Sequence, residues 1–161
     1  MPEAVADASA LVDLLLGNEL GYAVQRRISG HGLHAPAHID AEILSALGRL
    51  QRGGTIDDHG VEPMLHELAA DPVQRHTVAD LLLGAWARHH RLRLADALYV
   101  ELAVSRGLPL ITTDHRLHLV AVADIVIVCS CASRSPQTAN DHNYRPNQQK
   151  PRPKAGEICH L

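Results

Sequence analysis

The stretch LADALYVELAVSRGLPLITTD, residues 94–114, decides the fold because it joins a helix directly to a buried strand. A helix is predicted over residues 95–106, and Gly107 is typical of a helix end. The run that follows, residues 108–112, is short and almost wholly apolar, which predicts a strand buried on both faces. Because parallel strands need a crossover between them, a helix leading into such a strand indicates an α/β domain.

The same alternation extends in both directions from this stretch. Further strands are expected at residues 3–7, 33–35, 73–78 (a weak candidate) and 124–128. Further helices are expected at residues 8–16, from about 21 to 28, and at 37–52, 56–70, 79–90 and 115–122. The prediction is a three-layer α/β/α domain with a short parallel sheet of about four strands.

Composition separates an acidic body from a basic tail. The chain has 161 residues, of which 46% are hydrophobic and only 2% aromatic, so the core must consist of Leu, Val, Ile and Ala. Residues 1–128 hold 10 arginines, no lysine and 16 acidic residues, a formal charge of −6, whereas residues 129–161 carry +3. The tail has no apolar periodicity and is expected to be disordered. The predicted domain therefore spans residues 1–128.

Several classes of protein are excluded at this stage. The N-terminus lacks the basic segment of a secretory signal, and no apolar run is long enough to span a membrane. Three cysteines do not make a disulfide framework. The acidic body gives no argument for nucleic acid from charge alone. A cytoplasmic protein without membrane contact is expected.

Four acidic residues are placed where such a sheet would bring them together. Asp7 and Asp114 each directly follow a predicted strand, at the carboxyl edge where α/β proteins bind ligands. Asp96 begins a helix inside an apolar run, and Glu42 borders an apolar helical stripe. Each acid alone is explained by an ordinary role as a helix cap, a dipole partner or a surface residue. Their common location favours a function.

A group of carboxylates without basic partners repels itself unless a cation neutralises it. Oxygen ligands suit Mg²⁺ or Mn²⁺, which bind both carboxylates and phosphates. Such an ion activates water and stabilises negative charge on a phosphate. The four acids therefore predict metal-assisted hydrolysis of phosphodiester bonds.

Four motifs then resemble the PIN-domain nucleases, and specifically the VapC-type toxins of bacterial toxin–antitoxin pairs. They are VADASALV (5–12); AP (35–36) followed by EI (42–43) and AL (46–47); LADALYVELA (94–103); and PLITTD (109–114) followed by RL (116–117). Their order and spacing match over about residues 5–128. The resemblance implies the PIN-like fold and an endoribonuclease that cuts RNA with Mg²⁺ or Mn²⁺.

The resemblance also implies which acids do what. Asp7 and Asp96 would be the chief metal ligands. Glu42 and Asp114 would complete the pocket, hold water or bind a second ion. Some members of the family carry a further acid or Asn two residues after the fourth acid, where this chain has Arg116. The number of ions, one or two, stays open.

Small hydroxyl residues are expected to support these acids. By its place in the first motif, Ser9 would orient Asp7 or the bound phosphate. Thr112 or Thr113 would act similarly beside Asp114, with Thr113 the residue we place in the site.

The resemblance implies partners as well as a substrate. A VapC-like toxin is expected to form a homodimer and to bind a VapB-type antitoxin whose segment covers the acidic pocket. Two other functions stay open: a non-catalytic PIN module that binds RNA or protein, and a carboxylate-site, metal-dependent phosphatase.

The densest basic run, RHHRLR at residues 88–93, lies just before Asp96. Arg88, Arg91 and Arg93 are therefore predicted contacts for an RNA backbone. The alternative is a solvated helix end, where arginines are favourable.

The other aromatic and histidine residues point to no further site. Trp86 and Tyr99 are expected to pack in the core rather than to stack on a base. The 12 histidines match no zinc-binding spacing and are expected at the surface.

Overall fold

The computed structural model describes residues 1–119 and 125–129. Five parallel strands form one sheet in the order β3-β2-β1-β4-β5. They are β1 (Glu3–Ala6), β2 (Gly32–Pro36), β3 (Gln74–His76), β4 (Leu110–Thr112) and β5 (Ile125–Ile127). The sheet has one strand more than the four or so expected, with the weakly predicted β3 at an edge, paired only to β2.

Six α-helices and two short 3₁₀ helices lie among the described residues. The α-helices are α1 (Ala8–Leu16), α2 (Glu19–Ile28), α3 (Ile39–Arg52), α4 (Asp58–Ala70), α5 (Leu82–Trp86) and α6 (Leu94–Arg106); the 3₁₀ helices are η1 (Val78–Leu81) and η2 (His115–Leu119). The helix predicted over residues 79–90 is therefore divided into η1 and α5. Within the described residues none of these helices is long and apolar enough to cross a membrane.

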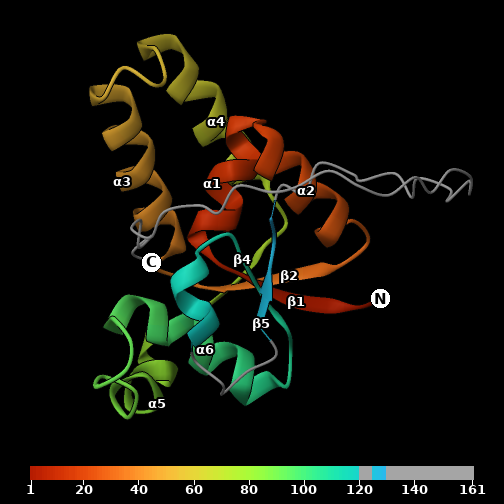
Figure 1. Cartoon of the computed structure of the whole chain (residues 1–161), viewed down its shortest axis with the longest axis vertical. Coiled ribbons are helices and arrows are strands. Elements are labelled where there is room, and N and C mark those ends of the chain that lie inside the picture. The colour runs from red at the N-terminus through yellow and green to blue at the C-terminus, as the bar shows by residue number, and fades with distance from the viewer. Residues whose placement is uncertain (120–124, 130–161) are drawn as a thin grey trace, which may run out of the picture. The chain divides into compact units, whose positions relative to one another are not determined.

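Helices cover both faces of the sheet, which confirms the three-layer prediction (Figure 1). On one face, Ala10 of α1 and Val24 of α2 pack with Ala4 and Ile111 of the strands. On the other face α6 lies across β1, β2 and β4, where its side chains join the larger core cluster. The core is aliphatic apart from Tyr99, which is fully buried on α6 as predicted.

The register of the two central strands sets the position of the site. Val5 pairs with Leu110 and Ala6 with Ile111, so β1 ends one residue before β4 does. The backbone N–H of Asp7 donates to the carbonyl of Ile111 over 2.9 Å. Whatever follows these two strands therefore meets at one edge of the sheet.

The compact unit covers Met1–Cys131, close to the predicted domain of residues 1–128. The basic tail predicted over residues 129–161 lies outside the described residues, apart from Cys129.

Candidate active site

One pocket at the carboxyl edge of the sheet contains all four predicted acids. Asp7 follows β1, Asp114 follows β4, and Asp96 and Glu42 lie in the first turns of α6 and α3. All four line a cavity of about 270 Å³. Residues separated by more than 100 positions in the sequence therefore share one small space.

Two hydroxyl groups hold the Asp7 carboxylate, which is only 7% exposed. Ser9 Oγ donates to Asp7 Oδ2 over 2.8 Å, and Thr112 Oγ1 donates to the same oxygen over 2.7 Å. Each hydroxyl also accepts a backbone N–H, from Thr113 and Asp114 respectively. Each N–H occupies one of the two lone pairs of its hydroxyl oxygen, while the hydroxyl hydrogen is donated to the carboxylate. Asp7 makes no side-chain capping bond to α1, so the simple cap explanation does not hold.

The supporting threonine hydroxyl belongs to Thr112, one residue before the predicted Thr113. Thr113 contributes its backbone N–H to Ser9 instead. The strand register explains the difference: Ala6 pairs with Ile111, so the next pair, Asp7 and Thr112, faces the same side of the sheet.

Burial makes the charge of two of the acids unfavourable. Burial raises the pKa of Asp7 above its ordinary value, and the nearby Glu42 raises it further, in spite of the two hydroxyl donors. Burial also raises the pKa of Asp96, with additional repulsion from Asp7 and Asp114. Neither Asp7 nor Asp96 forms an ion pair within the described residues.

Glu42 is held in its ionised form by two neighbours that the sequence reasoning did not place in the site. His38 Nε2 lies 3.3 Å from Glu42 Oε2, and Tyr99 Oη donates to that oxygen over 2.6 Å. The His38 imidazole, ahead of the Tyr99 hydroxyl, lowers the pKa of Glu42. Burial, reinforced by Glu42, raises the pKa of the Tyr99 phenol, which therefore stays protonated as a donor. A buried tyrosine generally needs a partner for its hydroxyl, and that was the available signal.

Asp114 forms an ion pair with Arg116, two residues further along the chain. The Arg116 guanidinium Nε lies 2.9 and 3.0 Å from the two carboxylate oxygens, and the Arg116 backbone N–H donates to Oδ1 over 2.9 Å. The guanidinium lowers the pKa of Asp114. Arg116 also lines the acidic pocket, together with Arg49 and Arg93.

The donor set is suited to a hard divalent cation. In the part of the chain that the structure describes, no three Asp, Glu, His or Cys side chains are close enough to form a ready metal cluster. Asp7 and Asp96 nevertheless offer carboxylate oxygens whose charge is unfavourable and has no ion-pair partner there. A bound cation would relieve this cost, so the residues fit Mg²⁺ or Mn²⁺.

The three arginines predicted as RNA contacts have different surroundings. Arg88 forms an ion pair with Glu101 and is 17% exposed, so it is not available to a backbone phosphate. Arg93 is exposed and lines the acidic pocket. Arg91 is exposed but does not line that pocket.

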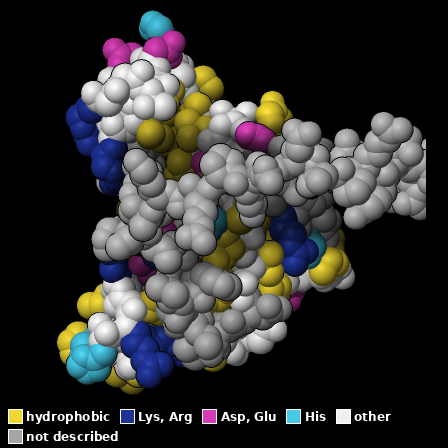
Figure 2. Space-filling model, in the orientation of Figure 1, with side chains coloured by type: hydrophobic (Ala, Val, Ile, Leu, Met, Phe, Trp, Pro, Cys, Tyr) yellow, Lys and Arg dark blue, Asp and Glu magenta, His cyan; other side chains and the backbone are white. Residues whose placement is uncertain are grey.

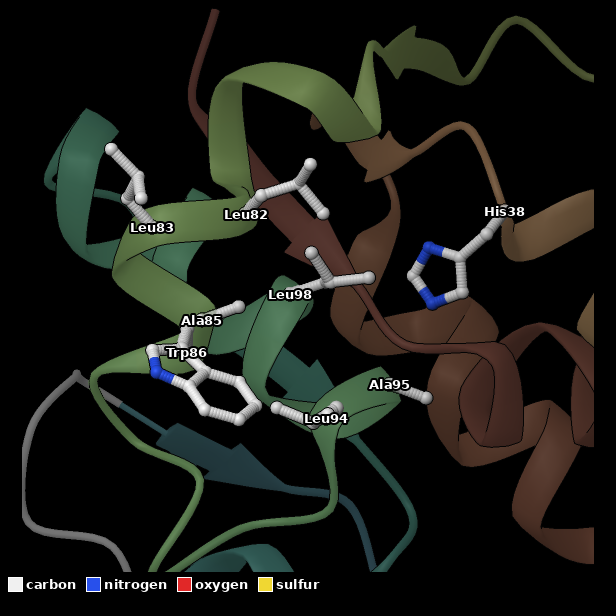
Figure 3. A pocket seen from close by; sticks show the side chains of 8 residues that line it. All are labelled: His38, Leu82, Leu83, Ala85, Trp86, Leu94, Ala95 and Leu98. Atoms are coloured by element: carbon white, nitrogen blue, oxygen red, sulfur yellow. The ribbon is translucent and has the colours of Figure 1, made fainter.

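An apolar pocket of about 510 Å³ lies beside the acidic one. Its lining consists of His38, Leu82, Leu83, Ala85, Trp86, Leu94, Ala95 and Leu98 (Figure 3). His38 also contacts Glu42, and Ala95 directly precedes Asp96, so these residues connect the two pockets. Trp86 was expected in the core, but it is 59% exposed and stacks on His89. Figure 2 shows hydrophobic, histidine and basic side chains gathered in the region of α5.

Comparisons with known proteins agree with the geometry. The sequence model of the PIN domain family matches residues 4–123, a range that includes all four acids. Ribonuclease VapC3 of Mycobacterium tuberculosis is 53% identical over 116 residues, covering 71% of this chain and 85% of that protein. Ribonuclease VapC12 of the same organism is 38% identical over 113 residues, covering 70% and 88%. The crystal structure of PAE2754 from Pyrobaculum aerophilum superimposes with a TM-score of 0.55 at 25% identity, covering 77% and 90%.

Proposed function

Because this chain belongs to the PIN domain family, and within it to the VapC ribonuclease toxins of toxin–antitoxin systems, we propose that its acidic pocket binds Mg²⁺ or Mn²⁺ to hydrolyse RNA phosphodiester bonds. The pair of Asp7 and Asp96 carries the proposal. These two carboxylates come from different elements, share one pocket and have their pKa values raised by burial. A cation that binds both removes the cost of holding them together.

Each acid has a role in this proposal. Asp7 and Asp96 would hold the ion, while Glu42 and Asp114 complete the pocket. The bound ion supplies a lowered pKa for the attacking water and positive charge for the scissile phosphate. His38 and Tyr99 together hold Oε2 of Glu42, so that the pKa of this carboxyl is lowered and it stays ionised at the wall of the pocket.

Arginines at the pocket bring positive charge to an otherwise acidic site. Arg49 and Arg93 line it beside the carboxylates. Guanidinium groups bind phosphate oxygens in a bidentate manner, so these two residues are suited to position the RNA backbone. Arg88 is left out of this role because Glu101 occupies it.

We also propose the protein partners that the family implies: a VapB-type antitoxin and a second copy of this chain, acting with it in the cytoplasm on RNA. Exposed Leu83 and Trp86 beside the acidic pocket support a protein contact there, since large exposed apolar side chains mark such surfaces. Light scattering of the chain alone and with the candidate antitoxin tests both. A monomer that forms no complex contradicts the proposal.

The products of RNA cleavage test the proposed reaction. The purified chain is incubated with end-labelled RNA in EDTA, Mg²⁺ or Mn²⁺, and the termini of the fragments are identified. Water activated by a bound ion would attack the phosphorus directly, and departure of the 3′-oxygen would leave 5′-phosphate and 3′-hydroxyl ends without a 2′,3′-cyclic phosphate. We expect those ends, and only with the cation present. Cleavage in EDTA with 2′,3′-cyclic phosphate ends would contradict metal-assisted hydrolysis.

Two further assays distinguish the other functions. Binding of RNA without cleavage under any of these conditions would indicate a non-catalytic module. Release of phosphate from p-nitrophenyl phosphate without RNA cleavage would indicate a phosphatase.

A further inference from the structure

One arginine of the acidic pocket, Arg116, already forms an ion pair with one of the four acids. Arg116 contacts both carboxylate oxygens of Asp114 through its guanidinium and one of them through its backbone N–H. Asp7 and Asp96 form no ion pair among the described residues. Of the four acids, Asp114 is therefore the one that an arginine already neutralises.

The exposure of the two side chains allows Arg116 to leave Asp114 for another anion. The Arg116 side chain is 65% exposed, whereas that of Asp114 is 18% exposed, so the guanidinium lies on the open side of the pair. Ion pairs with an exposed partner are weak because water and salt compete for both charges. The planar guanidinium also fits a phosphate as well as it fits a carboxylate. Asp114 and an RNA phosphate are thus alternative partners for the same group.

We propose that Arg116 is a latch that couples RNA binding to metal binding. In the free protein Arg116 holds Asp114 and weakens the pocket for a divalent cation. When a backbone phosphate enters, Arg116 transfers to it, and Asp114 is released to the cation. Because binding free energies are reciprocal, the phosphate then strengthens cation binding by the same factor that the cation strengthens phosphate binding.

The inference rests on the proposed metal-dependent function, but it predicts a quantity that a metal site alone does not. Without the latch, a phosphodiester raises cation affinity only through its direct contact with the cation, and that gain does not depend on Arg116. A purely structural role, in which Arg116 only orders η2, likewise predicts that replacing Arg116 leaves the coupling between the two ligands unchanged.

The test measures the Mn²⁺ affinity of the full chain by electron paramagnetic resonance, with and without dimethyl phosphate at matched ionic strength. Dimethyl phosphate is a phosphodiester without base or sugar. In the wild type we expect it to raise Mn²⁺ affinity about fivefold or more. Without phosphate, we expect Arg116→Gln to bind Mn²⁺ more tightly than the wild type does. We expect dimethyl phosphate to raise the Mn²⁺ affinity of this variant by a smaller factor than that of the wild type.

Two further variants distinguish the latch from a general effect of charge. Arg26→Gln removes an exposed arginine of α2 and should match the wild type. Arg116→Lys keeps the charge without the bidentate geometry and should retain part of the gain.

Two results would overturn the latch alone: unchanged or weaker Mn²⁺ binding in Arg116→Gln, or a gain from dimethyl phosphate as large in that variant as in the wild type. A wild type that binds no Mn²⁺ at all would instead remove the proposed function, and the latch with it.

Discussion

At the scale of single residues, the Asp7 carboxylate depends on two hydroxyls whose orientation the backbone fixes. Ser9 and Thr112 each accept one backbone N–H and donate to Asp7 Oδ2. Groups that orient a metal ligand in this way commonly contribute 10- to 100-fold to affinity or activity.

Removing the Thr112 hydroxyl should therefore weaken the site without removing a ligand. Thr112→Val keeps the shape of the side chain, and we expect Mn²⁺ affinity to fall about 10- to 100-fold. It also leaves the Asp114 N–H without its acceptor, at a cost to folding of about 1–3 kcal/mol. Thr112→Ser keeps the hydroxyl and serves as the control. Equal Mn²⁺ binding by both variants would show that the hydroxyl does not orient Asp7.

The raised pKa of Asp96 predicts how stability depends on pH. A carboxyl whose folded pKa lies above its unfolded value binds its proton more tightly when folded, so stability falls as pH rises between the two values. Above both pKa values the folded protein bears the full free-energy cost of the ionised Asp96 carboxylate. Without metal at pH 7, Asp96→Asn should be more stable than the wild type, and the difference should disappear below about pH 4.

Urea denaturation in EDTA at several pH values measures this difference. Asp80→Asn is the matched control, because Asp80 is exposed and outside the pocket. An Asp96→Asn variant that is no more stable than the wild type at pH 7 would show that the charge is not held at a cost.

The positions of the acidic site residues can be predicted from the sequence better than the side chains that contact them. Asp7, Asp96 and Asp114 could be located because they follow or begin predicted elements, and position along the chain is what a sequence records. The contact of Tyr99 with Glu42 crosses 57 positions, so no local pattern contains it. The ion pair of Arg88 with Glu101 is hidden for the same reason, which is why Arg88 was predicted as an RNA contact.

At the scale of elements, α1 and α2 approach each other closely at Gly21. A Cβ added to Gly21 of α2 would lie 2.0 Å from the backbone carbonyl oxygen of Asp13. Backbone atoms cannot yield as a flexible side chain can. The second helix was predicted to begin at about residue 21, whereas Gly21 lies inside α2 and lets the two helices meet.

Gly21→Ala should therefore lower the free energy of unfolding by about 1–3 kcal/mol, in spite of the better helix propensity of alanine. Gly48, inside α3, is the matched control, because an added Cβ there meets only the end of the Arg52 side chain, 3.4 Å away. Gly48→Ala should raise stability by up to about 1 kcal/mol. Urea denaturation compares the two, and a Gly21→Ala variant as stable as the wild type would contradict the packing argument.

Weak apolar patterns and local capping account for the remaining differences between the predicted and the observed elements. The edge strand β3 reads Gln-Arg-His and has no alternating pattern, so its membership of the sheet depends on pairing with β2. Helix α4 begins after Asp57, which accepts the Gly60 N–H, so Asp57 caps α4. Trp86 ends α5 and is exposed, a location that hydrophobicity alone does not predict.

At the scale of the whole molecule, the charge of −6 on residues 1–128 has a structural explanation. Part of it is concentrated in the acidic pocket, where in the proposed function a cation would offset it and Arg49 and Arg93 would contact RNA. An acidic domain can therefore act on a polyanion, because the local charge at the site matters more than the net charge.

We predict that the basic tail is dispensable for folding and for RNA cleavage. The compact unit ends at Cys131, and the four acids all precede it. A chain truncated after residue 131 should keep RNA cleavage and should match the full chain in unfolding free energy within about 0.5 kcal/mol. Loss of cleavage or of cooperative unfolding would show that residues 132–161 belong to the working domain.

The rate of RNA cleavage by Asp7→Asn and Asp96→Asn, measured with saturating Mn²⁺ beside the Asp80→Asn control, tests the central claim most directly. Asparagine keeps the size of the side chain but removes the charge that would hold the ion. We expect cleavage to fall at least about 100-fold in both pocket variants. We expect wild-type cleavage by Asp80→Asn, with all three variants folded by circular dichroism. Cleavage at the wild-type rate by a folded Asp7→Asn or Asp96→Asn would contradict the proposed metal site.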